Sequence, residues 1–150
     1  MKSKHDKLFE LISKGSTKAL SKYLQQHRPD LNAISREGWT PLMIACDHEH
    51  FEIVRLLVDG GADVNRRSAA GFGPLHTAVD TAIDSDCKHK LGRRVDDAPV
   101  DIVVYLLWKG ADPFARTNDG YSAADIAREA RSAKLVHLLE TYEWANGKLA

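Results

Sequence analysis

The stretch Gly38-Trp39-Thr40-Pro41-Leu42 returns 33 residues later, with changes, as Gly71-Phe72-Gly73-Pro74-Leu75. A more divergent third copy is Gly120-Tyr121-Ser122-Ala123-Ala124. A second phrase, Gly61-Ala62-Asp63-Val64-Asn65, also returns, as Gly110-Ala111-Asp112-Pro113-Phe114. Self-similarity at a period near 33 residues indicates a stacked array of repeats, in which neighbouring units bury a continuous core.

The length and composition suit one domain without a strong charge bias. The chain has 150 residues, with 21 basic and 21 acidic side chains. A balanced charge argues against nucleic-acid binding, which favours a basic excess. No apolar run approaches the about 18–20 residues of a membrane span, and no apolar segment follows the charged residues 1–7 as in a signal peptide. Cys46 and Cys87 form no disulfide or metal pattern. These features predict a soluble, cytoplasmic protein.

Apolar residues recur at spacings of three and four, which predicts short amphipathic helices in pairs. In the second pair, Thr40 before Pro41 predicts the start of a helix that ends near Glu49, since a hydroxyl can cap free N–H groups and proline suits the first turn. Its partner is expected from about Phe51 to Asp59. Gly60-Gly61 would end that helix, because glycine readily adopts the left-handed conformation.

The stretch 38–45, Gly-Trp-Thr-Pro-Leu-Met-Ile-Ala, and the stretch 51–65 resemble the ankyrin repeat almost residue for residue. The resemblance covers about residues 6–142 and implies an all-α ankyrin repeat solenoid of helix-turn-helix units with short hairpin loops. We expect a single domain over residues 1–150 with about four repeats and polar terminal units. As a short free-standing array, the chain resembles bacterial ankyrin proteins. The expected repeats are about 5–35, 36–68, 69–117 and 118–142, followed by a C-terminal tail at 143–150.

The third repeat is longer than the others. Gly71 and Gly120 lie 49 residues apart instead of 33, which indicates a 16-residue insertion at about 83–98. This highly charged segment is expected to extend the loop between the two helices and to lengthen the first of them. Inserted loops in repeat arrays often bind partners. A solvated excursion without a binding role is the alternative.

Three aromatic residues occupy one position of the repeat: Trp39, Phe72 and Tyr121, here called the aromatic column. The resemblance places this position near the junction of hairpin and first helix on the concave face, where partners bind. Aromatic side chains at low entropic cost are typical of interface hot spots, and we expect most of each ring to be accessible. Alternatively, the rings pack on one another and shield the hairpins.

A second column, on the exposed side of the first helices, carries Asp47, Asp80 and Glu129, with Lys14 at this position in the first repeat. An acidic strip beside aromatic rings would suit a basic partner, although Arg67 and Arg116 at the hairpins make the surface mixed in sign. An ordinary solvated helix face is the alternative. The residues predicted to bind a partner are Trp39, Phe72, Tyr121, Arg36, Glu37, Asp47, His48, Asp80, Arg67 and Arg116.

Val104 and Trp108 lie four residues apart, at positions where the ankyrin pattern usually carries charge. An exposed pair would form an apolar patch on the convex side. We expect the insertion to cover it, through Leu91 or Val95. A dimer contact is the alternative.

Several apparent chemical motifs lack the required pattern. The residues 48–50, His-Glu-His, do not have the zinc-protease spacing. His76 and Asp80 are four apart, but the resemblance makes His76 the structural histidine that bonds backbone between repeats. The segment 84–95 begins like a calcium loop yet lacks its glycine and final glutamate. Cys87 has no nucleophile context. We therefore expect no catalytic residue, no cofactor and no metal.

The sequence predicts a non-enzymatic module for protein–protein interaction. It would bind a partner protein through the concave face of hairpins and first helices, as an adaptor or regulator, and would be a monomer when free. The alternative is an immunity protein or inhibitor that neutralises a toxin or enzyme by binding it. An enzyme or metal site in the insertion is a remote alternative. Neither nucleic acid nor membrane is an expected partner.

Overall fold

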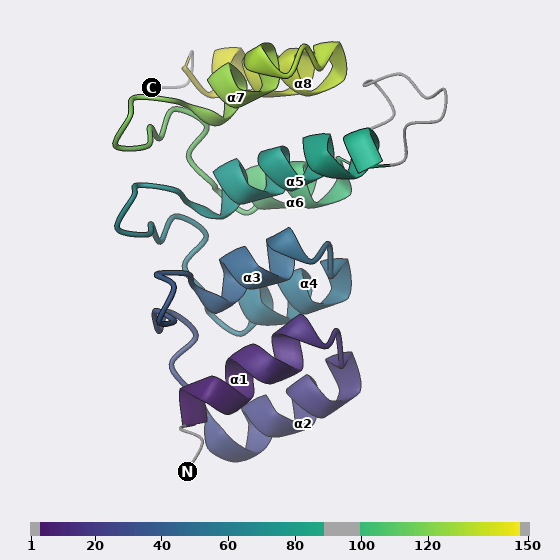
Figure 1. The fold of residues 1–150 in the computed structure, drawn as a ribbon, viewed down its shortest axis with the longest axis vertical. Coiled ribbons are helices and arrows are strands. Elements are labelled where there is room, and N and C mark those ends of the chain that lie inside the picture. Colours follow the sequence, from purple (N-terminus) through teal and green to yellow (C-terminus); the bar gives the residue numbers. More distant parts are fainter. Residues whose placement is uncertain (1–3, 89–99, 148–150) are drawn as a thin grey trace.

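The computed structural model describes residues 4–88 and 100–147, and the side chains of residues 5–84 and 100–142. In these ranges the chain forms eight α-helices, stacked as four antiparallel pairs (Figure 1). The predicted all-α solenoid of four helix pairs is confirmed. The helices are α1 (Lys4–Ser13), α2 (Thr17–His27), α3 (Pro41–Asp47), α4 (Phe51–Asp59), α5 (Pro74–Lys88), α6 (Asp101–Trp108), α7 (Ala123–Glu129) and α8 (Ala133–Gly147).

The first helices of the pairs, α1, α3, α5 and α7, form one row, and the second helices form another behind it (Figure 1). Neighbouring first helices contact one another more closely than neighbouring second helices. Fully buried alanines at equivalent positions, Ala45, Ala78 and Ala127, permit this close approach. The hairpin loops project from one side of the stack (Figure 1). We name the face made by these loops and the first helices the inner face.

The helix ends follow local sequence signals. The Thr40 Oγ1 accepts a hydrogen bond from the Met43 N–H at 3.1 Å, which confirms the predicted cap ahead of Pro41. The first helix of this pair stops at Asp47, two residues before the expected end, because Glu49 has a left-handed φ of 55°. The second helix has the predicted bounds, and Gly61 after it has a φ of 101°.

The three hairpins share one hydrogen-bond pattern, which explains the repeated phrase. In each, the carbonyl of the aromatic-column residue accepts a bond from the N–H four residues earlier, and the intervening glycine has a φ of 80–88°. A residue with a Cβ is strained there, so glycine precedes each aromatic residue. The bonds run from Ser35 to Trp39 (2.8 Å), from Ser68 to Phe72 (2.8 Å) and from Thr117 to Tyr121 (2.9 Å).

Hydrogen bonds between neighbouring hairpins fix the repeats relative to one another. Asparagine side chains supply most of them, and each satisfies backbone groups of the next unit. The stack therefore presents a preformed inner face. The bonds are Asp63 N–H to Asn32 Oδ1 (2.8 Å), Asp112 N–H to Asn65 Oδ1 (2.8 Å), Asn65 Nδ2 to Gly110 O (3.0 Å) and Asn118 N–H to Ala70 O (3.0 Å).

The insertion in the third repeat lengthens its first helix, as expected. The helix α5 has 15 residues, against 7 in each of α3 and α7. The eight extra residues add about 12 Å at the rise of an α-helix, so α5 extends beyond its neighbours (Figure 1). Residues 89–99, which include Leu91 and Val95, lie outside the described residues.

The last repeat has the charged outer positions expected of a terminal unit. Ser122 and Asp125 form a capping box at the start of α7. Glu140, at a position that other repeats fill with an apolar residue, is exposed and accepts a bond from Arg128 at 2.7 Å. The helix α8 continues through residues 143–147, where a tail was expected. None of the helices in the described parts of the chain is long and apolar enough to cross a bilayer.

Candidate protein-binding groove

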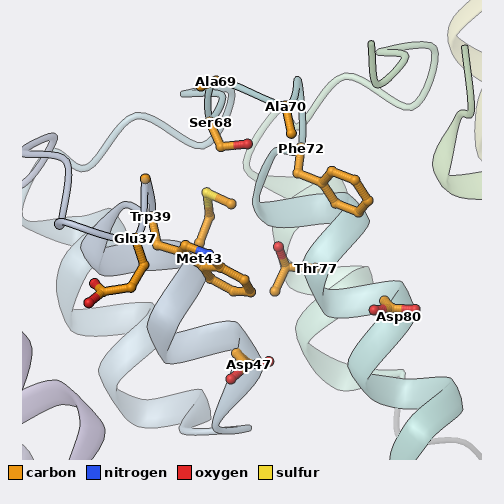
Figure 2. A pocket seen from close by; sticks show the side chains of 11 residues that line it. Glu37, Trp39, Met43, Asp47, Ser68, Ala69, Ala70, Phe72, Thr77 and Asp80 are labelled. Carbon is orange, nitrogen blue, oxygen red and sulfur yellow. The ribbon is translucent and has the colours of Figure 1, made fainter. Parts of the chain in front are cut away.

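A groove of about 420 Å³ opens on the inner face between α3 and α5 (Figure 2). We name it the inter-repeat groove. It brings together five of the ten predicted binding residues: Glu37, Trp39, Asp47, Phe72 and Asp80. The other lining residues are Gly38, Met43, Ser68, Ala69, Ala70 and Thr77.

Trp39 forms one wall of the groove. Its backbone N–H donates to Ser35 Oγ at 3.2 Å and its carbonyl accepts from the Ser35 N–H, so the hairpin holds its backbone on both sides. Figure 2 shows the indole beside Met43 and directed across the groove toward Thr77 on α5. The indole is therefore a pre-oriented apolar surface between two repeats.

The other two members of the aromatic column do not stack on Trp39. The ring of Phe72 points away from Trp39 (Figure 2) and lies 5.8 Å, between centroids, from the ring of His76. Trp39 and Phe72 are both half-buried, so the expectation that most of each ring is accessible is wrong for them. The alternative that these two rings pack on one another is also wrong.

Tyr121 belongs to a separate, shallower pocket near α7, lined by residues including Asp119, Asp125 and Glu129. Its side chain is 42% exposed. The negative charge of Glu129, and the hydrogen bond that Tyr121 makes with it, raise the pKa of the Tyr121 hydroxyl. Two members of the aromatic column, Trp39 and Phe72, thus line the inter-repeat groove, whereas the exposed Tyr121 lines a different pocket.

The end of the inter-repeat groove away from the hairpins is acidic. Asp47, the last residue of α3, and Asp80 on α5 line it from the two sides (Figure 2), and Asp84 follows one turn after Asp80. Partial burial of Asp80, together with the charges of Asp84 and Asp47, raises the pKa of the Asp80 carboxyl. The carboxylates therefore repel one another, and a cation between them would relieve that repulsion.

The described residues supply no basic partner to Asp47 or Asp80, since none of their ion pairs includes either carboxylate. Elsewhere the same chain does pair its carboxylates. The pairs include Lys14–Glu10 (2.6 Å), Lys109–Asp59 (3.2 Å), Arg116–Asp125 (3.1 Å) and Arg128–Glu140 (2.7 Å). Within residues 5–84 and 100–142, no basic side chain therefore pairs with the two carboxylates of the groove.

The predicted basic residues brace the hairpins. Arg67 Nε donates to the Gly71 carbonyl at 2.9 Å, and Arg116 Nη1 donates to the Gly120 carbonyl at 2.6 Å. Neither lines the inter-repeat groove. Arg36 and His48 are exposed and also lie outside its lining. The structure therefore gives Arg67 and Arg116 a structural role, whatever they contribute to binding.

Comparisons with known proteins agree with this architecture. A family model of ankyrin repeats in three copies matches residues 7–88, and a model of the single ankyrin repeat matches residues 70–118. The chain belongs to the ankyrin repeat family. Ankyrin repeats bind other proteins and generally form non-enzymatic interaction modules, so this chain is a protein-interaction module.

The chain is similar to ankyrin proteins with several different names. It is 30% identical over 123 residues to Protein phosphatase 1 regulatory subunit 27 of Homo sapiens, which covers 81% of this chain and 70% of that protein. It is 27% identical over 143 residues to Putative E3 ubiquitin-protein ligase XBAT35 of Arabidopsis thaliana, covering 93% and 27%. It is 46% identical over 56 residues to Protein fem-1 homolog A-like of Mus musculus, covering 37% and 9%. The chain spans less than a third of the last two proteins.

Sequence reasoning missed six of the eleven lining residues of this ankyrin groove, and two of the six, Met43 and Thr77, lie on the helices α3 and α5. Both are buried, at 1% and 4% exposure, and were hidden among core positions. A signal for Met43 was present, because Met43 and Asp47 are four apart on α3 and share one face of that helix. Trp39 lies four residues before Met43, so this spacing could have linked the aromatic column with the column of Asp47 and Asp80.

His76 has the structural role that the ankyrin resemblance implied. Its Nδ1 accepts a bond from the Gly73 N–H at 3.3 Å, which leaves the proton on Nε2 to bond the Ala115 carbonyl at 3.0 Å in the next hairpin. Burial, the largest influence, lowers the pKa of His76 and favours the neutral ring. Both ring nitrogens are thus committed to backbone groups.

The other residues considered for nucleophilic or metal chemistry are Cys46, Cys87, His48 and His50. The thiol of Cys46 is buried, and burial raises its pKa far above the ordinary value. The rings of His48 and His50 stack at 5.6 Å between centroids. Among the side chains of residues 5–84 and 100–142, no three His, Cys, Asp or Glu form a group that could hold a metal ion. The side chain of Cys87 lies outside the described residues.

A second exposed surface lies on the outer helix row. Val104 and Trp108 on α6 are 45% and 72% exposed. The Lys109 Nζ lies 4.7 Å from the centroid of the Trp108 ring and 5.5 Å from that of Tyr105. The residues expected to cover this patch lie outside the described range, so both the covering and the dimer contact stay predictions.

Proposed function

We propose that this ankyrin chain binds a partner protein through its inner face, with the inter-repeat groove at the centre of the contact, and acts as an adaptor or regulator. The observation that carries the proposal is the groove itself. The indole of Trp39 and the carboxylates of Asp47 and Asp80, which have no basic partner among the described residues, line one preformed cleft. Such a combination of apolar anchor and charge favours specific recognition.

The rigidity of the face supports the same conclusion. Bonds from Asn32, Asn65 and His76 hold each hairpin to the next repeat before any partner arrives. A preformed surface loses little conformational entropy on binding, so more of the contact energy appears as affinity. The groove also lies between repeats, where a segment of a partner would contact two units at once.

The relatives support regulation through binding. One carries the name of a regulatory subunit of protein phosphatase 1, and others carry the names of E3 ubiquitin-protein ligases. An inhibitor or immunity protein that covers an enzyme or toxin is the second form of the same function. The partner's own activity, measured free and in the complex, separates an inhibitor from an adaptor. A cytoplasmic location and a monomeric free chain are parts of this proposal.

Photocrosslinking tests the location of the contact. The unnatural residue p-benzoylphenylalanine replaces Ala70, an exposed lining residue of the groove, or Val104 on the outer row as the control. In lysate of the source cell, the groove position is expected to crosslink to a defined protein that the control position does not capture. Crosslinking of the same protein only from position 104 would contradict the proposal.

A further inference from the structure

The inter-repeat groove has two chemically different ends, joined by one apolar floor. Trp39, Met43 and Asp47 follow the α3 side from the hairpin outward, and Thr77 and Asp80 follow the α5 side (Figure 2). An occupant that enters from the hairpin end first meets aromatic and aliphatic surface and then carboxylates. That order matches a long side chain with an apolar stem and a cationic head.

The charge at the far end comes from two helices. Asp47 is the C-terminal residue of α3, where the free carbonyls of the last turn add partial negative charge. Asp80 and Asp84 are four residues apart on α5, so they share one face of that helix. The lengthening of α5 in the third repeat is what adds Asp84, because α3 and α7 end before the equivalent turn.

Several acidic side chains elsewhere in the solenoid have a basic partner, unlike those at this acidic end. Asp59, Asp125 and Glu140 each have a basic side chain within 3.2 Å. Asp47 and Asp80 are without such a partner among the described residues, and partial burial of Asp80, followed by the nearby charges of Asp84 and Asp47, raises the pKa of the Asp80 carboxyl. The complementary ligand is therefore a cation.

We propose that the inter-repeat groove accepts an arginine side chain of the partner, with its stem along Trp39 and Met43 and its guanidinium between Asp47 and Asp80. The inference rests on the proposed function and specifies the chemistry of its contact. A guanidinium has five N–H donors in a planar fork, so it bonds carboxylates on two helices at once. A lysine ammonium is a compact, strongly hydrated charge, which suits a half-apolar groove less well.

The test uses a random 12-residue peptide library displayed on phage and selected on the whole chain. Peptides recovered on the wild type are expected to share an arginine at one position. One such peptide is then synthesised with that arginine and with citrulline, its neutral isostere. Their dissociation constants are measured on the wild type, on Asp80→Asn and on Glu52→Gln, which removes an acidic charge from α4 on the outer row.

The expected result is a loss of about tenfold or more on replacement of arginine by citrulline, for the wild type and for Glu52→Gln, because a charge-assisted pair is removed. On Asp80→Asn the same replacement should change the affinity by less than about threefold, since one carboxylate is already absent. Thermal unfolding of both variants establishes that they are folded.

Three outcomes would overturn the inference. The first is a set of peptides without a shared basic residue, the second is a shared lysine that arginine cannot replace without loss of affinity, and the third is an equal citrulline effect on Asp80→Asn and the wild type. If such peptides still lose binding on Trp39→Ala, the proposed function stands and only the arginine inference fails. Failure to recover any peptide also counts against the arginine inference. Crosslinking from position 70 then tests the proposed function separately.

Discussion

The Nε2 of His76 lies 3.0 Å from the carbonyl oxygen of Ala115, which is 39 residues later in the chain. This bond ties α5 of the third repeat to the hairpin that leads into the fourth. The other ring nitrogen accepts a bond from the Gly73 N–H within its own repeat. One buried imidazole therefore joins two neighbouring units of the solenoid.

Replacement of His76 by alanine should destabilise the fold. The variant leaves the buried Gly73 N–H and the partly buried Ala115 carbonyl without their partner, and each such loss costs about 1–3 kcal/mol. Urea unfolding is expected to show a total loss of about 2–6 kcal/mol. His48→Ala, at an exposed position, is the control and should be nearly neutral. Equal effects of the two substitutions would show that the His76 hydrogen bonds do not stabilise the fold.

The same histidine predicts a pH dependence of stability. Burial lowers the pKa of His76 in the folded chain, so the unfolded chain takes up the proton more readily. The stabilisation by the neutral ring is complete above the ordinary histidine pKa of about 6.5 and is lost as the pH falls below it. Between pH 7.5 and 5.5, the wild type should lose more unfolding free energy than His76→Gln. A larger loss in the variant would mean that the folded chain holds this ring charged.

Asp80→Asn should stabilise the free chain at neutral pH. The pKa of Asp80 is raised in the folded state, so folding disfavours its charged form. The wild type therefore loses stability as the pH rises above the ordinary aspartate pKa of about 4, and the variant does not. The melting temperature of Asp80→Asn should exceed that of the wild type at pH 7, and this gap should close below about pH 4. A variant that melts lower at pH 7 would show that Asp80 has a stabilising partner.

Two glycines of the repeated phrase predict a matched pair of alanine variants. Gly38 and Gly71 have similar φ values, 86° and 80°, so alanine strains the backbone at both by about 1–2 kcal/mol. A Cβ at Gly38 meets nothing within 4 Å, whereas one at Gly71 would lie 2.8 Å from the Asn118 backbone nitrogen. Urea unfolding of Gly71→Ala is expected to show an additional cost of about 1 kcal/mol or more, because the hairpins must separate. Equal costs would mean that the hairpin of the fourth repeat lies farther from the hairpin of the third repeat.

The sequence predicted the fold because local signals repeat in register. Glycines before Trp39, Phe72 and Tyr121 fix three equivalent hairpins, and Thr40-Pro41 sets the start of a helix. Helix ends were less predictable. Glu49 adopts a left-handed conformation, and because it is not a glycine the sequence did not indicate a helix end there, so α3 is shorter than expected.

The candidate site was only partly predictable, because repeat position gives the place of a side chain and not its direction. The indole of Trp39 crosses toward Thr77 on α5, while the ring of Phe72 points away from Trp39 and lies near the ring of His76 (Figure 2). Tyr121 occupies the same repeat position but belongs to another pocket. Only packing against Met43, Thr77 and His76 decides these directions, and the sequence columns do not contain that information.

The most direct test of the central claim compares two tryptophans with one partner. Trp39 lines the inter-repeat groove, and Trp108 is exposed on the outer row. The dissociation constant of the crosslinked protein is measured by calorimetry for Trp39→Ala and Trp108→Ala, with thermal unfolding to establish that both remain folded. A groove-centred contact predicts a loss of about thirtyfold or more for Trp39→Ala, as for an interface hot spot, and little change for Trp108→Ala. Unchanged binding by folded Trp39→Ala, or loss only in Trp108→Ala, would contradict it.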